Sequence, residues 1–417
     1  MSRRGLFGAL GAGALGAGVG AAAVFGSDVA VQAATGNFPA AASATPFFGR
    51  HQAGITTASQ DRLYFAAFDV ADGMDRAGLI QLLKEWTNAS ARMTQGLGAG
   101  TEPVSAGDYE APPEDTGEAL GLSPAGLTIT VGFGPSLFKD AAGRDRFGIA
   151  GRRPAALVDL PAFPGEDLIA GSSNGDLCVQ ACSDDPQVAV HAIRNLSRIA
   201  FGRAVMRWSQ LGFGRTSSTT RAQVTARNLF GFKDGTSNLK AEDTELVNRW
   251  VWAGREGDWM RDGSYLTVRK IQMRIETWDH QTLSDQEATI GRTKPQGAPL
   301  SGGTEYSALN FHAKGQGGPL IPTDAHVRLA HPTANGGAQL LRRGYNFADG
   351  NDDLGRMNAG LFFAAYQRDP RTQFIPVQTR LASSDALNEY TVHVGSGIFA
   401  IPPGVERGSY LGAPLFA

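Results

Sequence analysis

The alternation of hydrophobic and polar positions in the first half of the chain predicts strands and helices in a definite order. Apolar residues alternate with polar ones in strands, whereas in helices they recur every three or four residues. Helical spacing is found from Leu79 to Trp86 and again after the N-cap pair Asp185-Pro186. The predicted strands are residues 63–70, 127–132, 176–182 and 204–213. The order strand–helix–strand–strand–helix–strand is that of a ferredoxin-like unit.

The second half of the chain repeats this order. Ile271, Met273 and Ile275 alternate with polar residues, which predicts a strand with one solvated face. Ser284 and Glu287 have the spacing of a capping box and predict the start of a helix. The remaining elements predicted in this half are strands at 339–347, 361–367 and 390–401 and a helix at 374–381.

Two similar α+β halves with a boundary near residues 215–225 are therefore expected. We assign residues 61–220 to an N-terminal ferredoxin-like domain and residues 221–417 to a C-terminal one. The segments 97–126 and 133–175 are rich in proline and glycine and too long for simple connections. They are expected to fold over the core as loops.

The N-terminus has the pattern of a targeting segment. Ser2-Arg3-Arg4-Gly5-Leu6-Phe7 is a twin-arginine motif, and no charged residue follows it up to Gly26. This glycine- and alanine-rich stretch is only weakly hydrophobic, which favours an export signal over the alternative of a membrane anchor. We therefore predict a signal peptide at 1–33, cleaved near Val31-Gln32-Ala33, and a linker at 34–60. The mature protein is expected to be extracellular, cell-wall-associated or periplasmic, with no stable membrane span.

Composition and short motifs exclude several classes of protein. The net charge is −2, so the chain lacks the excess of positive charge that is typical of nucleic-acid-binding proteins. Cys178 and Cys182 lie on one predicted strand, about 13 Å apart, which is beyond the reach of a disulfide. The absence of Cys-x-x-Cys-His excludes covalent attachment of a c-type haem. Zinc-binding His-Glu-x-x-His, Gly-x-Ser-x-Gly, Walker and Rossmann patterns are also missing.

Of the seven histidines, His326 has the most informative surroundings. His191 is interpreted as a surface residue on the polar side of a helix, and His393 as a structural residue within a strand. Arg342 and Arg343 follow His326 in a strand-like run. Because neighbours on a strand point to opposite faces, only one of these arginines can enter an interior pocket, and the other should be solvated.

Asp234 stands in an unusual frame, Gly231-Phe232-Lys233-Asp234-Gly235-Thr236-Ser237-Asn238. Glycine permits positive φ and close backbone approach, so this carboxylate can be aimed at a planar ligand pressed against the main chain. An ordinary Asp-Gly turn is the alternative. An iron porphyrin needs one axial nitrogen on one side and a base and a cation on the other if peroxide is to react there. His326, Asp234 and Arg342 can fill these three roles.

The sequence resembles the dye-decolourising peroxidases of the exported bacterial type over nearly all of the mature chain. The matching motifs are His51-Gln52-Ala53-Gly54-Ile55, the Gly231–Asn238 frame, Asp324-Ala325-His326-Val327-Arg328-Leu329, Leu341-Arg342-Arg343-Gly344-Tyr345 and Leu361-Phe362-Phe363-Ala364-Ala365-Tyr366-Gln367. Together these motifs are highly specific, whereas the Gly-x-x-Asp-Gly element alone would be weak.

The resemblance implies a barrel-like fold of two ferredoxin-like units, with haem b in the C-terminal unit. It implies that His326 is the proximal iron ligand, Asp234 the distal acid–base and Arg342 the distal cation, with Arg343 as the alternative. The residues expected along the haem are Gly235, Thr236, Ser237, His331, Pro332 and Thr333, with Phe363 over the distal face or, alternatively, in the core. The implied partners are hydrogen peroxide and a small-molecule reductant, and a homo-oligomer is among the expected assemblies.

Some questions stay open at the level of sequence. Asp385 and Glu389 are both candidates for the carboxylate behind the axial histidine. Aromatic residues offer a relay of electrons to the surface, with core packing as the alternative: Trp208, Trp250, Trp252, Trp259, Trp278, Tyr345 and Tyr366. The chain equally resembles exported peroxidases proposed to release iron from haem, which gives a deferrochelatase as the alternative function. A haem carrier without turnover ranks last, because it would not need Asp234 and an arginine on the open side.

Overall fold

The computed structural model describes residues 44–104, 107–254 and 258–417. The predicted signal peptide lies outside these residues, so its export role stays a prediction. Across the part of the chain that is described, no helix is long and apolar enough to cross a membrane. Residues 44–60 pack against the body: His51 stacks on Trp252 with 3.7 Å between ring centroids.

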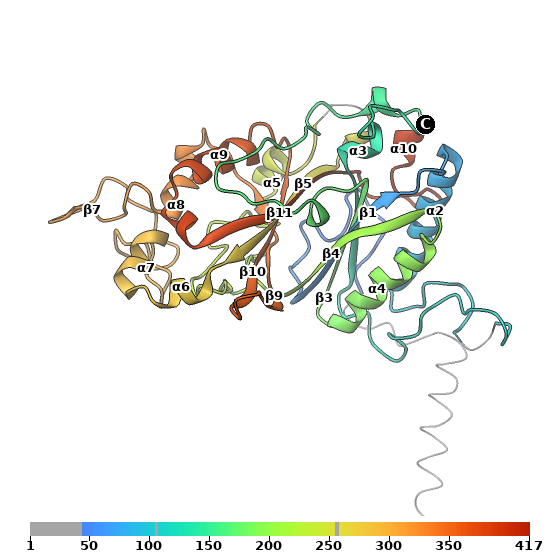
Figure 1. Ribbon diagram of the computed structural model, residues 1–417, viewed down its shortest axis with the longest axis horizontal. Coiled ribbons are helices and arrows are strands. Elements are labelled where there is room, and N and C mark those ends of the chain that lie inside the picture. Colours follow the sequence, from blue (N-terminus) through green and yellow to red (C-terminus); the bar gives the residue numbers. More distant parts are fainter. Residues whose placement is uncertain (1–43, 105–106, 255–257) are drawn as a thin grey trace, which may run out of the picture.

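The first half of the chain forms four strands and two long helices in the predicted order (Figure 1). The segments between them are irregular apart from the short helices α3, η1 and η2 (Pro135–Phe138, Ala150–Arg152 and Ala170–Ser172), as the sequence predicts. The main elements are β1 (Arg62–Val70), α2 (Arg76–Met93), β2 (Thr128–Phe133), β3 (Leu177–Ser183), α4 (Pro186–Ile199) and β4 (Ala204–Arg215).

The second half contains four further long strands, with more and shorter helices around them. Its strands are β5 (Ser264–Met273), β8 (Leu341–Arg342), β9 (Tyr345–Asn351), β10 (Met357–Gln367) and β11 (Thr391–Ile401), and its helices are α5 (Thr244–Trp250), α6 (Ile275–Asp279), α7 (Leu283–Ile290), α8 (His326–Leu329), α9 (Phe374–Ser384) and α10 (Ala413–Phe416). The short helices η3 (Asp258–Met260), η4 (Pro332–Ala334) and η5 (Ala386–Glu389) and the small hairpin β6–β7 (Lys314–Gly315 and Gly318–Pro319) complete it. The hairpin projects away from the body (Figure 1).

The nine main strands form one antiparallel sheet in the order β5-β11-β2-β3-β1-β4-β9-β10-β8. Because β10 also pairs with β5, the sheet closes on itself. Within the sheet, strands of the two halves pair over short stretches: Ala400 with Phe133 on one side, and Phe213 and Arg215 with the start of β9 on the other. The chain is therefore an α+β protein built around a closed sheet.

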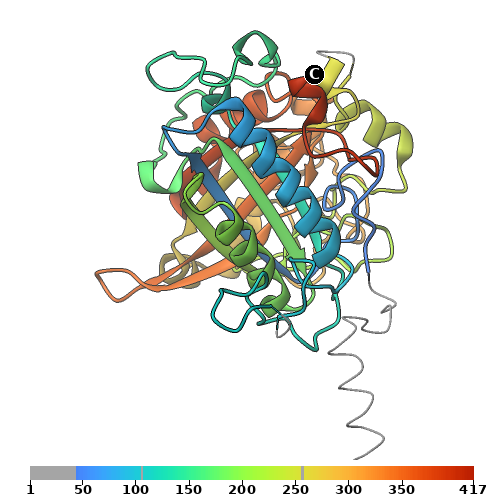
Figure 2. The ribbon, with the colours of Figure 1, turned by 90° about the vertical axis from the view of Figure 1, so that its right-hand side faces the viewer.

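Helices α2 and α4 lie side by side on the outside of the N-terminal half of the sheet (Figure 2). The helix α4 begins as predicted: the Asp185 side chain accepts a hydrogen bond from the Gln187 N–H, and Pro186 occupies the first turn. Its apolar face, with Ala189, Ile193 and Leu196, is buried against the sheet and α2. A separate cluster of aromatic and aliphatic side chains fills the closed sheet, and includes both free, buried cysteines.

Three predicted elements differ from the structure. Ile275 begins α6 rather than ending a strand, because β5 stops at Met273. The N-cap of α7 is Thr282, whose hydroxyl accepts from the Asp285 N–H, while the Glu287 side chain accepts from the Lys294 N–H instead. The predicted strand 339–347 is interrupted between β8 and β9. A Cβ on Gly344, between these two strands, would lie 2.7 Å from the Thr216 hydroxyl, so a larger residue there would require Thr216 to move.

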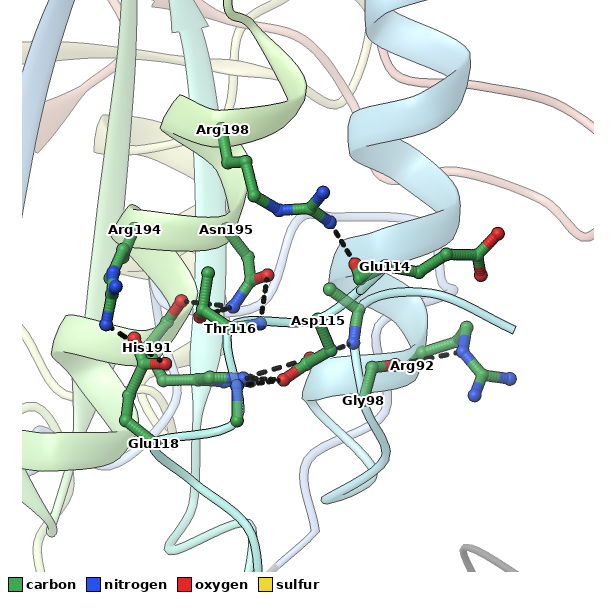
Figure 3. Close-up of polar contacts among 12 residues, drawn as sticks. Arg92, Gly98, Glu114, Asp115, Thr116, Glu118, His191, Arg194, Asn195 and Arg198 are labelled. Atoms are coloured by element: carbon green, nitrogen blue, oxygen red, sulfur yellow. Dashed lines mark hydrogen bonds and ion pairs between the residues drawn. The ribbon is translucent and has the colours of Figure 1, made fainter. Parts of the chain in front are cut away.

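The prediction that His191 lies on the surface is wrong. His191 is 4% exposed, and its Nε2 lies 3.0 Å from both carboxylate oxygens of Asp115 (Figure 3). Asp115 belongs to the irregular segment 97–126, which covers this face of α4. Asn195 and Arg198 of the same helix also bond to the segment, at Thr116 and at the Glu114 carbonyl. Polar residues on one side of α4 therefore hold a covering loop, which the helical period alone could not reveal.

Breaking this buried pair should destabilise the protein. Burial by itself favours the neutral acid, but hydrogen bonds from His191, Ala99 and Gly117 outweigh it and lower the pKa of Asp115 to about 2. Because the folded pKa is depressed, the contribution is complete above the unfolded value near 4 and is lost as the pH falls from about 4 to about 2.

We expect Asp115→Asn to lower the free energy of unfolding by about 3 kcal/mol at pH 7, with a smaller difference at pH 3. Urea denaturation at the two pH values measures this, with the exposed Asp108→Asn of the same segment as control. Equal stability of the two variants at pH 7 would contradict the prediction.

Candidate functional site

A cavity of about 260 Å³ lies in the C-terminal half of the molecule. Its walls come from β5, β10 and β11 of the sheet, from α8 and α9, and from the Gly231–Asn238 frame. The sequence-predicted residues that line it are Asp234, Gly235, Thr236, Ser237, His326, His331, Pro332, Arg342 and Phe363. Thr333 is not among the lining residues. It lies next to them in η4, where its hydroxyl and its N–H both contact Nδ1 of His331.

His326 is the first residue of α8 and is fixed by a carboxylate from a distant segment. Its Nδ1 lies 2.6 Å from Oδ2 of Asp385, which is 6% exposed. The second oxygen of Asp385 accepts from the Leu387 N–H, so this carboxylate is held at both ends. Burial lowers the pKa of His326, but the charge and hydrogen bond of Asp385 outweigh it, and the net shift is upward. The ring therefore uses Nδ1 for Asp385 and keeps Nε2 as the nitrogen that can bind a metal.

Of the two candidate carboxylates, the structure brings Asp385 and not Glu389 to the histidine. Glu389 is exposed, and its main-chain carbonyl accepts from Arg274. Asp385 is the N-cap of η5, directly after α9. The turn between the helix and the final strand thus points Asp385 at the cavity and Glu389 at solvent.

Asp234 and Arg342 form an ion pair in the same cavity, with Nη1 of Arg342 2.6 Å from Oδ1 of Asp234. Both charges also act on His326. Asn238, at the end of the Gly231–Asn238 frame, binds the main chain of Arg342 twice: its Oδ1 accepts from the Arg342 N–H at 2.7 Å and its Nδ2 donates to the Arg342 carbonyl at 2.8 Å. The frame therefore holds both the carboxylate and the strand that supplies its guanidinium.

Glycine is required on the C-terminal side of Asp234. Gly235 has φ +86°, and a Cβ there would lie 2.9 Å from Cα of Ser217. The positive φ that glycine permits is confirmed, and the close approach is to a neighbouring loop of the protein. An approach to a planar ligand stays a prediction. Asp234 is thus placed by the packing of its own main chain against residues 216–218.

The alternative distal cation, Arg343, points away from the cavity as strand alternation predicts, but the prediction that it is solvated is wrong. It is 0% exposed, and its guanidinium donates to the carbonyls of Thr57 and Ala58 and to the side chain of Gln60. The reason is the closed sheet: the face opposite the cavity is the filled interior of the barrel and not water. Arg342 is therefore the arginine that enters the site.

Three charged residues of the cavity wall were not predicted to belong to the site. Arg292, 5% exposed, and Lys233 lie at the wall, and Lys233 pairs with Glu305. Arg269 of β5 also lines the cavity. The position of Arg269 could have been inferred, because alternation along β5 places it on the same face as Ile271. Arg292 and Glu305 lie in an irregular segment, where no periodicity indicates which side chains point inward.

The aromatic residues considered for electron relay are mostly core residues. Trp250 is only partly buried, whereas the others are buried. Trp208, Trp252, Tyr345 and Tyr366 fill the closed sheet, and Trp259 and Trp278 belong to the clusters under the outer helices. A relay role for any of them stays a prediction.

Comparison with known proteins gives matches over both halves of the chain. Residues 52–214 match the family model described as Dyp-type peroxidase, N-terminal, and residues 225–406 match that described as Dyp-type peroxidase, C-terminal. The chain is 37% identical to the deferrochelatase of Yersinia pseudotuberculosis over 379 residues, which cover 89% of this chain and 84% of that protein.

Solved structures of similar proteins have the same fold. Ferric DtpA from Streptomyces lividans superimposes with a TM-score of 0.81 at 38% identity, covering 91% of this chain and 99% of that one. A DyP-type peroxidase from Streptomyces coelicolor superimposes with a TM-score of 0.80 at 40% identity, covering 88% and 95%. The family models and these relatives together cover both halves of the closed sheet and the cavity, and the chain belongs to the Dyp-type peroxidase family of haem-containing oxidoreductases.

Proposed function

We propose that this chain is a haem b peroxidase that uses hydrogen peroxide to oxidise dyes, phenols or other one-electron donors. The observation that supports it most is that two residue pairs line one cavity: His326 with Asp385, and Asp234 with Arg342. An imidazole oriented by a carboxylate is a metal ligand. A carboxylate beside a guanidinium can move a proton and stabilise the negative charge that develops when an O–O bond breaks.

The residues present fit an iron porphyrin. His326 keeps Nε2 available as a ligand for iron, and Asp234 and Arg342 would offer a carboxylate and a guanidinium in the same cavity. The cavity wall includes the apolar residues Ile271, Leu361 and Phe363, which suit a flat macrocycle. Three cations of the cavity wall, Lys233, Arg292 and Arg342, stand against Asp234 of the wall and Glu305, which pairs with Lys233. That excess of positive charge suits the acidic edge of the porphyrin.

Bound haem would supply the iron at which peroxide is reduced and oxidising equivalents are held. The chain would supply the rest. The Asp234 carboxylate accepts the proton from one peroxide oxygen and delivers it to the other, so that water can leave. Arg342 stabilises the negative charge on the departing oxygen and, through its ion pair, holds Asp234 in position. Asp385 keeps the His326 ring oriented and raises its basicity toward the metal.

We also propose that the closed sheet is built from two ferredoxin-like units. Read in the same direction, the strand orders are β4-β1-β3-β2 in the first half and β11-β5-β10-β9 in the second. Both have the fourth long strand beside the first, then the third and the second, which supports two ferredoxin-like units in one barrel. The cofactor would lie in the C-terminal unit. We further propose that the twin-arginine segment directs export, on the sequence pattern alone.

Adding one equivalent of peroxide to the purified protein tests the proposed function. We expect a Soret band in the purified protein, an immediate change of the spectrum with peroxide, and its return when a phenol is added. Absorption spectroscopy in a stopped-flow instrument measures all three. A haem spectrum that does not respond to peroxide would contradict a peroxidase and favour a carrier.

The curated relatives suggest a second function, because several are named deferrochelatase at 37% identity. In that case the cavity would take haem as substrate and release its iron. Anaerobic incubation with haem separates the two functions. Iron-free porphyrin, detected by its fluorescence, would favour the deferrochelatase, and unchanged haem together with peroxide turnover would favour the peroxidase.

A further inference from the structure

A second polar cluster lines the cavity on the side of the sheet, and the mechanism above does not use it. Its centre is Arg269, which is 1% exposed. The Arg269 Nε donates to Nδ1 of His393 at 3.0 Å, and Nη1 donates to the Ser396 hydroxyl at 2.8 Å. Its Nη2 pairs with Glu166, which comes from the long segment between β2 and β3. Arg269 and His393 both contribute to the cavity wall.

These contacts determine which nitrogen of His393 has the proton. The Nε–H of an arginine can only donate, so Nδ1 of His393 must be the acceptor and is unprotonated. Burial and, to a lesser extent, the charge of Arg269 lower the pKa of His393 to about 3, so the ring is neutral. Its proton is therefore on Nε2. No acceptor for this N–H is found among the residues that the structure describes, and His393 offers it to the contents of the cavity.

The surroundings of Arg269, the partner of His393, are neutral and aromatic. The charge of Arg269 is balanced by Glu166. Phe163 lies under the guanidinium, with 5.5 Å from Cζ to the ring centroid. Phe374 contacts both Phe163 and Phe363, with 6.1 Å between centroids in each case. A neutral donor beside aromatic rings suits a neutral ring with an oxygen acceptor better than it suits an anion, which would need an excess of positive charge.

The cluster also lies close to the proposed chemistry. Phe363 of β10 is the register partner of Arg269 in β5. On the other side of β10, two residues along, Ala365 pairs with Arg342 in β8. Phe363 therefore stands between the cluster and the Asp234–Arg342 pair. A molecule bound at His393 would lie at the same face of the cavity as the proposed site of peroxide reduction.

We propose that His393 is a binding residue for a small neutral phenol, whose hydroxyl oxygen accepts the Nε2–H while its ring lies against Phe363 and Phe374. This inference rests on the proposed function, in which the phenol is the reductant. In the overall reaction two phenols each lose one electron and one proton, and one peroxide gains both electrons and both protons to give two waters. Arg269 and Glu166 are positioning residues, because they fix the tautomer and keep the site uncharged.

Binding of phenol and of toluene to the holo-protein without peroxide tests this site. Toluene has a methyl group in place of the hydroxyl, so it reports the ring contacts alone. We expect wild type to bind phenol about tenfold more tightly than toluene, the effect of one hydrogen bond in a dry site. In His393→Leu that preference should disappear, and in His393→Gln, which keeps both an acceptor for Arg269 and a donor, most of it should return. Ligand-observed NMR titration gives the dissociation constants.

The outcomes separate this inference from its alternatives. A purely structural role of His393 would weaken phenol and toluene equally in His393→Leu, and an unchanged preference for phenol would also overturn the proposal. Benzoate provides a further arm: if it binds wild type more tightly than phenol and loses this in His393→Leu, the site takes anions and the assignment to neutral phenols is wrong.

In turnover we expect the KM for phenol to rise about tenfold in His393→Leu with kcat nearly unchanged. If the wild-type spectrum does not respond to peroxide, the proposed function fails, but the comparison of phenol with toluene still decides whether His393 binds a hydroxyl. The two failures are therefore distinguishable.

Discussion

Replacement of His326 by alanine is expected to abolish stable binding of haem. The histidine offers the cavity a single oriented Nε2, and the Asp385 contact at 2.6 Å holds that ring. Loss of an outer carboxylate weakens a metal site about 10–100-fold, so loss of the ligand itself should cost at least about 100-fold in affinity. The pyridine haemochrome assay on purified protein, and the rate of haem transfer to apomyoglobin, measure this.

Two further variants make the result specific. His312 is an exposed histidine in the segment before α8, and His312→Ala should keep the full haem content. Asp385→Asn keeps the size of the partner but removes its charge, so it should lie between wild type and His326→Ala. Added imidazole should restore part of the haem spectrum in His326→Ala, because the space of the ring is then vacant. Full haem content with an unchanged spectrum in His326→Ala would mean that another residue binds the iron.

Asp234→Asn is expected to slow the reaction with peroxide while leaving haem binding intact. The asparagine has nearly the same shape but cannot accept the peroxide proton, and general acid–base catalysis of this kind contributes about 10²–10⁴-fold. The observed rate constant of the peroxide-dependent absorbance change, measured by stopped flow at several peroxide concentrations, should fall by that factor. The exposed Asp353→Asn serves as control and should react at the wild-type rate.

The partner of Asp234 provides a second route to the same conclusion. Arg342→Leu removes the cation and leaves Asp234 without its ion pair, so both charge stabilisation and positioning are lost. Because the two residues act as one unit, the double variant should be little slower than the slower single variant. Wild-type rates in both single variants would show that the pair has no part in the reaction. Rate losses that simply multiply would show that the residues act separately.

Much of the site could be predicted because its residues stand in short motifs. The frame around Asp234 has the positive φ at Gly235 that glycine permits, and strand alternation correctly separated Arg342 from Arg343. The accompanying prediction that Arg343 is solvated was wrong. From the sequence alone, the face of the strand opposite the pocket is expected to be exposed to solvent. Closure of the sheet makes it part of the filled interior, where Arg343 is fully buried. Only long-range pairing, here β10 with β5, determines which faces are exposed.

Contacts between distant segments also explain the other differences between the sequence-based predictions and the structure. His191 has the period of an exposed position on a helix, and it is buried only because a loop from residues 97–126 returns over α4. Neither Asp385 nor Glu389 could be chosen from sequence, because the choice depends on the turn between α9 and β11. His393 was interpreted as structural, and its free N–H became visible only beside Arg269.

The sequence by itself determined the α+β class, the order of the long strands and helices and the residues able to perform the chemistry, because these follow from local periodicity and from motifs a few residues long. The tertiary structure alone decided which charged side chains share the cavity, which carboxylate lies behind His326 and which polar residues are buried. Those contacts join residues 59 to 286 positions apart. They arise when the sheet closes and loops cover it, and no local pattern encodes that event.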